Sequence, residues 1–277
     1  MQFPLAYQSE NPMLITVITV CFNSARTIGR TIETLRSQTY CDFEHIVIDG
    51  GSTDDTIEIV SASPSDRFTQ TIISEPDNGI YDAMNKGIRL AKGEIIAFLN
   101  SDDWYGSPDL LNRVASFFES DISADNDMIG GRVIQIDRDT GVWKRVIDTS
   151  LFQSWQLYCG NMPPHPAIFV RKSVFSDVGH FNTKLKVAAD FDFFVRSLLL
   201  KQMRISSLDG ITTYMSAGGV SSAGYRSNLL ITREMFWSLR ANDLPAFRVL
   251  LWLRFPAKIL IQVAPLWINN LAKRVVN

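Results

Sequence analysis

Residues 96–104 read IAFLNSDDW, which is four apolar residues followed at once by an amide, a hydroxyl, two carboxylates and a tryptophan. An apolar run of this length, preceded by Gly93 and Glu94, predicts a buried strand. Asp102 and Asp103 then stand side by side where the strand ends, although adjacent carboxylates repel each other and gain nothing from burial. We expect a bound ligand to relieve this repulsion.

The composition is that of a globular chain. Its 277 residues are 46% hydrophobic and 20% charged, enough for one large or two small α/β domains with a substantial core. The net charge of −2 provides no basic field, so we expect no nucleic-acid partner. The three cysteines are odd in number, widely spaced and without zinc-type pairing, which favours reduced thiols in a cytoplasmic protein.

The N-terminus lacks the basic segment of a signal peptide. Residues 1–12 read as an N-terminal extension. The apolar stretch MLITVITVCF that follows has ten residues, which suits a strand and is too short for a membrane span. Residue 13 is therefore the expected start of the folded domain.

The first half of the chain alternates between strand and helix patterns. Strands are predicted over 14–23, 43–50, 69–75 and 94–100, and helices over 24–38, 52–62, 79–93 and 107–120. This alternation predicts an α/β fold with a mostly parallel, Rossmann-like sheet flanked by helices and joined by right-handed crossovers. In such sheets, ligands bind outside the carboxyl ends of the strands.

Polar groups gather at those ends. The first strand ends in Asn23, the second in Asp49, the third leads into EPDNGIYDAMNKG, and the fourth ends in NSDD. A hard cation such as Mg²⁺ or Mn²⁺ prefers oxygen ligands and is often shared between one or two carboxylates and the phosphates of a substrate. We therefore expect Asp102 and Asp103 to hold a metal-bound diphosphate, and Asp49 to accept hydrogen bonds from a base or ribose.

Five stretches together resemble the family 2 inverting nucleotide-sugar glycosyltransferases, which have the GT-A fold. They are ITVITVCFN, IVIDGGSTDDT, SEPDNGIYDAMNKGI, GEIIAFLNSDDW and HPAIFVRKSVFSDVGHFNTKLKVAADFDFFVR, in this order over about residues 13–222. The forms GIYDAMNKGI and LNSDDW look like those of bacterial enzymes that build cell-surface polysaccharide. The resemblance implies a nucleoside-diphosphate sugar as donor and a saccharide, lipid-linked in this type, as acceptor.

The resemblance also implies a set of donor-binding residues: Thr19, Phe22, Asn23, Asp49, Asp54, Asp77, Lys86, Gly87, Ser101, Asp102 and His165. The family's Asp-x-Asp metal motif falls on Asn100-Ser101-Asp102, so its first acid is an amide here. This departure leaves metal ligation to Asp102 and Asp103, without deciding which of the two contacts the ion. His165 is alternatively an ordinary loop residue.

The catalytic carboxylate of the family usually lies in a Glu-Asp pair; here the pair is Ala189-Asp190, so the resemblance implies that the one remaining acid, Asp190, has this role. An inverting displacement needs one base, which accepts the proton of the attacking hydroxyl. Asp192 lies two residues on, about 200° round the helix, so it does not share this role. From spacing alone, Asp190 would be a helix N-terminal acid favoured by the dipole.

The second half is less regular, as expected for an acceptor-binding half. We assign residues 13–106 to the nucleotide-sugar half and 107–225 to the acceptor half, with a hairpin around RDTG. The segment SAGGVSSAGYR is either a linker or a lid in which Arg226 contacts phosphate. Phe152, Trp155 and Tyr158 either pack in the core or stack on a sugar.

Residues 226–277 form a C-terminal helical tail of different composition. From residue 240 on, the chain contains six basic residues and one acidic residue. The longest uncharged stretch, 259–272, is too short to span a bilayer. A basic amphipathic helix lying on an anionic membrane surface is expected, which would make the protein peripheral on the inner face of the plasma membrane. The alternative is a helix pair packed on the domain.

Several other classes lack their motifs. No G-x-G-x-x-G or P-loop follows the first strand, and CFNSARTIG is not the glycine-rich loop of a sugar nucleotidyltransferase. A catalytically inactive GT-A-fold protein that binds sugar nucleotides remains the alternative. Release of nucleoside diphosphate that depends on Asp190 would separate it from a transferase.

Overall fold

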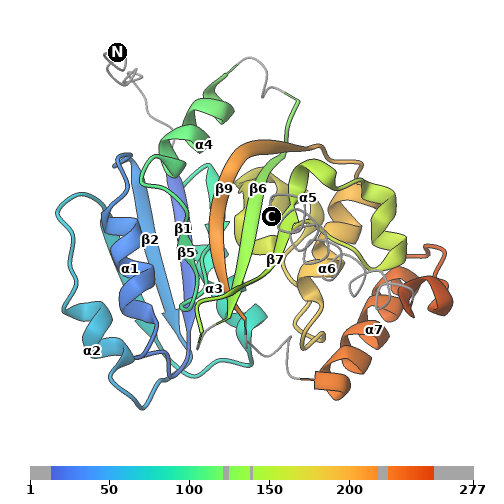
Figure 1. Ribbon diagram of the computed structural model, residues 1–277, viewed down its shortest axis with the longest axis horizontal. Helices are drawn as coiled ribbons and strands as arrows, with labels where there is room; N and C mark the ends of the chain where they lie inside the picture. Colours follow the sequence, from blue (N-terminus) through green and yellow to red (C-terminus); the bar gives the residue numbers. More distant parts are fainter. Residues whose placement is uncertain (1–13, 121–124, 138–139, 218–223, 253–277) are drawn as a thin grey trace, which may run out of the picture.

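One sheet of nine strands organises the chain in the computed structural model, which describes residues 14–120, 125–137, 140–217 and 224–252 (Figure 1). The strand order is β3-β2-β1-β4-β8-β6-β9-β5, with β7 beside β6. The four predicted strands of the first half are present and parallel: β1 (Ile15–Cys21), β2 (Phe43–Asp49), β3 (Thr69–Ser74) and β4 (Ile95–Phe98). The predicted Rossmann-like arrangement is confirmed.

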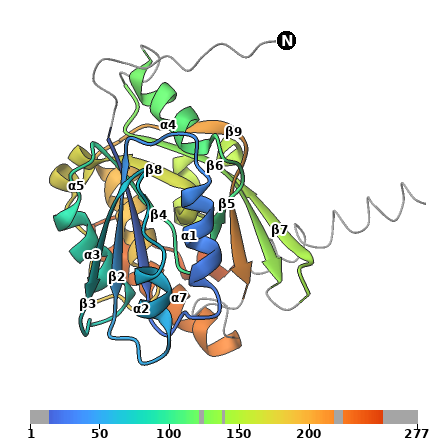
Figure 2. The same ribbon diagram turned by 90° about the vertical axis from the view of Figure 1, so that its left-hand side faces the viewer.

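Helices cover both faces of this sheet, as Figure 2 shows. On one face lie α1 (Ile28–Arg36), α2 (Thr56–Ser61) and α4 (Leu110–Glu119). On the other lie α3 (Ile80–Leu90), α5 (Lys172–Val178), α6 (Ala189–Phe194) and α7 (Gly224–Ala241). Alternation along β1 explains both layers, because Val17 packs towards α1 and α4 while Ile18 packs towards α3.

The second half of the sheet is mixed. The strands are β5 (Trp104–Tyr105), β6 (Met128–Asp137), β7 (Trp143–Asp148), β8 (Ile168–Arg171) and β9 (Ile205–Ala217). β6 and β7 form the predicted hairpin, and β8 runs antiparallel between β4 and β6. Short 3₁₀ helices over Thr149–Leu151, Ser154–Cys159 and His165–Ala167 connect β7 to β8. The two-residue β5 is too short for the sequence pattern to reveal.

Two helical features differ from the simple sequence pattern. The predicted helix beyond Ala189 changes after α6 into a π-helix over Val195–Leu200, which widens the turn. The predicted helix from Ser52 begins only at Thr56, because the preceding residues form the turn that follows β2. The second difference leaves Ser52 and Asp54 in a loop at the carboxyl edge of the sheet.

The first part of the C-terminal region packs on the domain. Met235, Leu239 and Leu251 are buried in the largest core cluster together with residues of α5 and α6. The expected boundary at 225/226 thus falls at the start of a helix that shares the common core. Among the described residues, no helix is both long and apolar enough to cross a membrane. The tail beyond residue 252 and the core of the predicted lid, 218–223, lie outside the described residues.

Gly87 lets α3 approach Ile18 of β1 closely. A Cβ at this position would stand 2.5 Å from Cγ2 of Ile18. We expect Gly87→Ala to lower the free energy of unfolding in urea by about 1–3 kcal/mol, the usual cost of overpacking a core. Gly29→Ala is the matched control, because the nearest atom there is 3.9 Å away. Equal stability of the two variants would show that α3 can shift without cost.

Candidate functional site

A buried carboxylate at the end of β2 organises the carboxyl edge of the sheet. Asp49 accepts hydrogen bonds from the backbone of Gly51 (3.1 Å) and Ser52 (2.9 Å) and from the hydroxyls of Ser52 (2.5 Å) and Ser74 (2.7 Å). The Cys21 thiol donates a longer bond of 3.6 Å. Burial raises the pKa of Asp49, but the donors from Ser52, Ser74 and Gly51 outweigh it and hold the pKa below its ordinary value.

The turn after β1 is bonded to the turn after β2. Asn23 has left-handed backbone geometry, with φ of 49°, and its N–H donates to the Ser52 hydroxyl at 2.8 Å. Its side-chain Oδ1 accepts the N–H of Thr53 at 2.9 Å. Asparagine tolerates this backbone region better than most residues, which accounts for its place here.

Asp54 strengthens the same junction. Its carboxylate accepts the hydroxyl of Thr56 at the start of α2 and the N–H of Ala25, 3.1 Å away, in the turn after β1. The hydrogen bond from Thr56 is the main reason why the pKa of Asp54 lies below its ordinary value. Its negative charge is therefore fixed close to the two turns.

Phe22, Gly50 and Asp77 meet above these turns. A Cβ on Gly50 would lie 2.6 Å from Oδ2 of Asp77 and 3.4 Å from Cδ2 of Phe22, so only glycine leaves room here. Phe22 is 61% exposed, which is unusual for phenylalanine. On α3, Lys86 forms an ion pair with Glu75 at 2.8 Å. The edge thus presents an open aromatic ring beside a carboxylate.

The turn after β4 completes the edge. The Ser101 hydroxyl lies 2.8 Å from that of Ser24, which joins this turn to the one after β1. Asp102 is half-buried, and its backbone carbonyl accepts the Ser216 hydroxyl of β9 at 2.7 Å. Together with the bond from Ser74 at the end of β3 to Asp49, these contacts connect all four predicted strand ends directly by hydrogen bonds.

The two adjacent carboxylates have different environments. Asp103 is 1% exposed, and its carboxylate accepts the Asn100 side-chain amide at 3.0 Å and the Ser216 N–H at 3.2 Å. These contacts fix the turn against β9, and the expected role of Asp103 as a metal ligand stays a prediction. Asp102 keeps access to the edge. The sequence could not separate these neighbours, because the difference arises from β9, more than 100 residues later.

Asp190 lies at the same edge, on the second residue of α6. Its Oδ1 accepts the hydroxyl of Tyr81 at 3.2 Å and the N–H of Phe191 at 2.8 Å. Tyr81 belongs to the first turn of α3, just beyond the carboxyl end of β3, and so brings Asp190 to the edge. Burial raises the pKa of Asp190 to about 6, although the hydrogen bonds from Phe191 and Tyr81 oppose this rise.

His165 lies among aromatic rings rather than among polar groups. Its ring stacks on Phe98 at a centroid distance of 5.2 Å and meets Phe181 edge-on at 5.7 Å. Burial lowers the pKa of His165 to about 4, so the imidazole is neutral at pH 7. Since Phe181 also contacts Tyr81, this aromatic group connects the end of β4 with the surroundings of Asp190.

The structure brings most predicted site residues together, with two exceptions. Thr19 is fully buried within β1, and its hydroxyl lies 2.9 Å from Nε2 of His45. Gly87 packs on Ile18 below the edge. Sequence reasoning missed Tyr81 and Ser216, whose contacts with Asp190 and the NSDD turn arise only from the fold. Tyr81 could have been noticed as the polar-tipped residue within the motif GIYDAMNKGI.

Comparisons with known proteins agree with this geometry. Residues 16–179 match the model of Glycosyl transferase family 2. The chain is 32% identical over 216 residues to a PGL/p-HBAD biosynthesis glycosyltransferase of Mycobacterium bovis (strain BCG / Pasteur 1173P2), covering 76% of this chain and 79% of the relative. It is 27% identical over 183 residues to the chondroitin synthase of Escherichia coli, covering 66% of this chain but only 26% of that relative.

Solved structures share the fold. S. aureus TarS in complex with UDP-GlcNAc superposes with a TM-score of 0.63 at 22% identity, over 82% of this chain and 66% of TarS 1-349. The mannosyltransferase PcManGT from Pyrobaculum calidifontis, in complex with GDP-Man and Mn²⁺, gives 0.61 at 17% identity, over 88% of this chain and 68% of that one. Fold and sequence together define a glycosyltransferase with the GT-A fold. The chain belongs to glycosyl transferase family 2.

Asp49→Asn tests the organising role of the buried carboxylate. The amide cannot accept all four short bonds, so we expect a loss of about 2–3 kcal/mol of unfolding free energy at pH 7. Because the folded-state pKa of Asp49 is depressed, its contribution is complete above the unfolded pKa near 4 and disappears as the pH falls through the folded value. Urea unfolding at several pH values should show the stabilities of the two proteins converging as the pH falls below about 4, and a constant difference would contradict this account.

Proposed function

We propose that this glycosyltransferase moves a sugar from a nucleoside-diphosphate sugar to an acceptor hydroxyl, with inversion at the anomeric carbon and Asp190 as the base. The observation that carries the proposal is one half-buried carboxylate with a raised pKa, bonded to Tyr81 at the edge where the turns after β1, β2 and β4 meet. A base with a pKa near 6 is ionised at pH 7 yet still basic enough to accept a proton. A single such group suits an inverting displacement.

The donor nucleoside would lie against the exposed Phe22 ring, beside Asp77. An open aromatic face and a nearby acceptor suit a base and its N–H groups. Asp49 would act mainly by holding the turn of Gly51 and Ser52, since four short bonds already occupy its oxygens. Asp54 would have the same supporting role for the turn that carries Asn23. Lys86 would lie along the ribose and diphosphate.

A divalent cation fits the turn after β4. Mg²⁺ and Mn²⁺ are often held by one or two carboxylates together with substrate phosphates. The turn offers the half-buried carboxylate of Asp102 and, two residues earlier, Oδ1 of Asn100. This amide oxygen is buried and accepts no hydrogen bond within the described part of the chain. When bound there, the ion would neutralise charge on the departing diphosphate.

A complete protein cage for the ion is absent from the described residues, which contain no group of three or more His, Cys, Asp or Glu side chains placed to hold a metal. The phosphates would therefore supply much of the coordination, so metal and donor should bind together. His165 is buried and neutral, and we assign it to shaping the wall between this turn and Asp190.

The reaction at Asp190 follows from its contacts. The acceptor hydroxyl would approach the anomeric carbon from the face opposite the diphosphate and give its proton to the carboxylate as the new C–O bond forms. Tyr81 donates to Oδ1, which leaves Oδ2 to receive the proton. The Tyr81 hydroxyl is itself held protonated, since burial and then Asp190 raise its pKa well above the ordinary value.

The chemistry of the acceptor is inferred from relatives and sequence. The relative from Mycobacterium bovis is named for PGL/p-HBAD biosynthesis and the one from Escherichia coli for chondroitin. We propose a saccharide, lipid-linked in the type of pathway that builds surface polysaccharide. Just before the proposed membrane-facing tail, the side chains of Phe247, Val249 and Trp252 are exposed. They give an apolar surface at the C-terminal end of the described residues, which supports this proposal.

Ligand binding gives the most direct test of the donor class. A thermal-shift panel with UDP, GDP, UDP-GlcNAc and GDP-mannose, each with and without Mn²⁺, should show stabilisation that depends on the nucleotide and increases with metal. The candidate donors are those named for TarS and PcManGT. Binding without any release of nucleoside diphosphate would favour the alternative of an inactive sugar-nucleotide-binding protein.

Asp190→Asn should reduce release of nucleoside diphosphate by about 10²–10⁴-fold, the usual contribution of a general base, and leave donor binding close to wild type. In the wild type, the rate should rise with pH through about 6, because the ionised carboxylate is the active form. Retention of more than about a tenth of the rate, measured against this 10²–10⁴-fold range, would remove Asp190 from the mechanism.

Asp102→Ala and Asp103→Ala should have different effects. Loss of Asp102 should weaken the Mn²⁺-dependent part of UDP or GDP binding by at least about tenfold, because this half-buried carboxylate would hold the ion. Loss of Asp103 should lower the free energy of unfolding by about 1.5–3 kcal/mol, because its partners Asn100 and Ser216 are left without an acceptor. Isothermal titration and urea unfolding of both variants provide the test. The same response of both variants in both measurements would show that the two acids act as one ligand pair.

A further inference from the structure

α7 carries one acidic side chain, and it is buried. Glu234 is 8% exposed, and its carboxylate accepts the N–H groups of Lys186, Val187 and Ala188, each at 3.0 Å. Among the described residues, no basic side chain is paired with it. Burying a carboxylate costs free energy unless hydrogen-bond donors compensate for the lost water, and here backbone N–H groups do so. The contact therefore joins α7 to the segment 186–188.

The three bonded N–H groups lie immediately before α6. Ala188 is the N-cap of that helix and has no side-chain oxygen to bond the first turn, and Asp190 is the second helical residue. The N–H groups that enter a helix need acceptors. Here the acceptor comes from α7, 46 residues later in the chain. The position of Asp190 therefore depends on a side chain from another helix.

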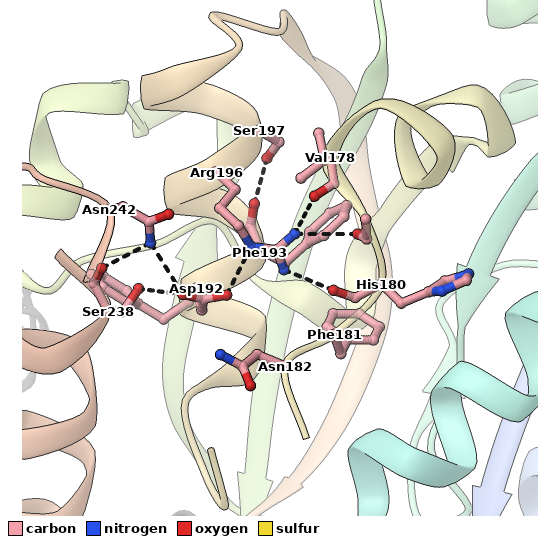
Figure 3. Close-up of polar contacts among 12 residues, drawn as sticks. Val178, His180, Phe181, Asn182, Asp192, Phe193, Arg196, Ser197, Ser238 and Asn242 are labelled. Atoms are coloured by element: carbon pink, nitrogen blue, oxygen red, sulfur yellow. Dashed lines mark hydrogen bonds and ion pairs between the residues drawn. The ribbon is translucent and has the colours of Figure 1, made fainter. Parts of the chain in front are cut away.

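A second contact fixes the same pair of helices. Ser238 donates to Oδ1 of Asp192 at 2.7 Å, and Asn242 approaches the same oxygen at 3.4 Å. Oδ2 of Asp192 forms an ion pair with Arg196 at 2.8 Å, and Figure 3 shows Asp192 between these groups. Glu234, Ser238 and Asn242 follow one another at four-residue spacing, so they form one stripe along the helix.

Arg196 extends the contact to the loop between α5 and α6. Its guanidinium donates to the carbonyls of Val178 (2.5 Å), Gly179 (3.3 Å) and His180 (2.9 Å), as drawn in Figure 3. The next residue, Phe181, belongs to the aromatic group around Tyr81. Asp192 is thus neutralised by its own partner, while the charge of Glu234 is met by backbone dipoles alone.

We propose that Glu234 is a positioning residue for the base Asp190: it fixes the segment 186–188 that leads into α6 and places a negative charge beside the base. The inference rests on the proposed function of Asp190, and it assigns to α7 a part in the reaction. Glu234 touches neither donor nor acceptor in this proposal. It acts through the backbone that carries Asp190.

Among the described residues, two ionisable side chains from the packed elements act on the titration of Asp190, Tyr81 from α3 and Glu234 from α7. Tyr81 lowers the pKa of Asp190 by donating to its ionised form, and Glu234 raises this pKa by repulsion. His165 is neutral and Asp192 is paired with Arg196. Removing each of the two facing groups should therefore move the titration of Asp190 in opposite directions.

The direct test follows the Asp190 carboxyl by carbon NMR in the full-length protein labelled with ¹³C-aspartate, using Asp190→Asn to assign the signal. Glu234→Gln should lower the midpoint by about half a pH unit, the size expected for one charge near a helix terminus. Tyr81→Phe should raise it. Glu33→Gln, a matched change on the exposed face of α1, should leave it unchanged. An unchanged midpoint in Glu234→Gln overturns the electrostatic part of the proposal.

Turnover tests the positioning part. With UDP-GlcNAc or GDP-mannose and Mn²⁺, Glu234→Gln should lower kcat by about 10–10²-fold, as expected for a slightly misplaced catalytic group, and leave KM for the donor within about twofold. In the pH profile of kcat for Glu234→Gln, the rise on the acidic side should shift to lower pH by the same amount as the NMR midpoint of Asp190. Glu234→Asp keeps the charge but has a shorter side chain, so it should retain the wild-type midpoint of the Asp190 titration and lower kcat. This variant provides the test if Glu234→Gln does not fold.

Failure of this inference differs from failure of the proposed function. If Asp190→Asn retains the rate, the base is elsewhere and the proposed function fails. If Asp190→Asn abolishes the rate while both Glu234 variants keep the wild-type kcat, pH profile and NMR midpoint, then α7 is only a packing helix and this inference alone is overturned.

Discussion

The hydrogen bonds around a single buried carboxylate hold the carboxyl edge of this sheet in place. Parallel strands bring their ends to one edge, but the turns that follow them are short of regular backbone partners. Asp49 supplies four acceptor contacts to the turns after β2 and β3. The hydrogen bond between Ser52 and Asn23 then ties the turn after β1 to the turn after β2. The hydrogen bond between Ser24 and Ser101 ties the turn after β4 to the turn after β1. The edge is rigid because its polar groups bind one another.

Two carboxylates at this edge show how environment separates structural and chemical roles. Asp49 and Asp190 both experience a desolvation penalty, yet Asp49 has enough donors to stay strongly acidic, while Asp190 has too few and becomes a weaker acid. The number of hydrogen-bond donors around each oxygen decides the difference. A group saturated with donors is suited to hold a turn, and a group with an unfilled oxygen is suited to accept a proton.

Much of the first half and the hairpin of the second half could be predicted from the sequence, because apolar runs, turns and helix caps are local signals. Strands β1 to β4, the hairpin of β6 and β7, and the gathering of polar residues at one edge all follow from such patterns. Contacts between distant segments had no local signal. Asp102 and Asp103 are indistinguishable in the sequence, and only the contact of Asp103 with β9 separates them. The hydrogen bond of Tyr81 to Asp190 joins residues 109 positions apart. Thr19 and Gly87 matched a family position, and the fold places Thr19 beside His45 within the sheet and Gly87 against Ile18.

The thiol next to Asp49 has a chemical consequence. Cys21 is buried at the end of β1 and donates to Oδ1 of Asp49. Burial is the main cause, and the charge of Asp49 the second, of a pKa of the Cys21 thiol far above its ordinary value. The reactive thiolate therefore does not form at this position. The exposed Cys41 lies near the opposite end of the strands. Alkylating or oxidising reagents should therefore spare the thiol at the carboxyl edge, and Cys41 becomes a single attachment point for a fluorophore away from that edge once the half-buried Cys159 is replaced.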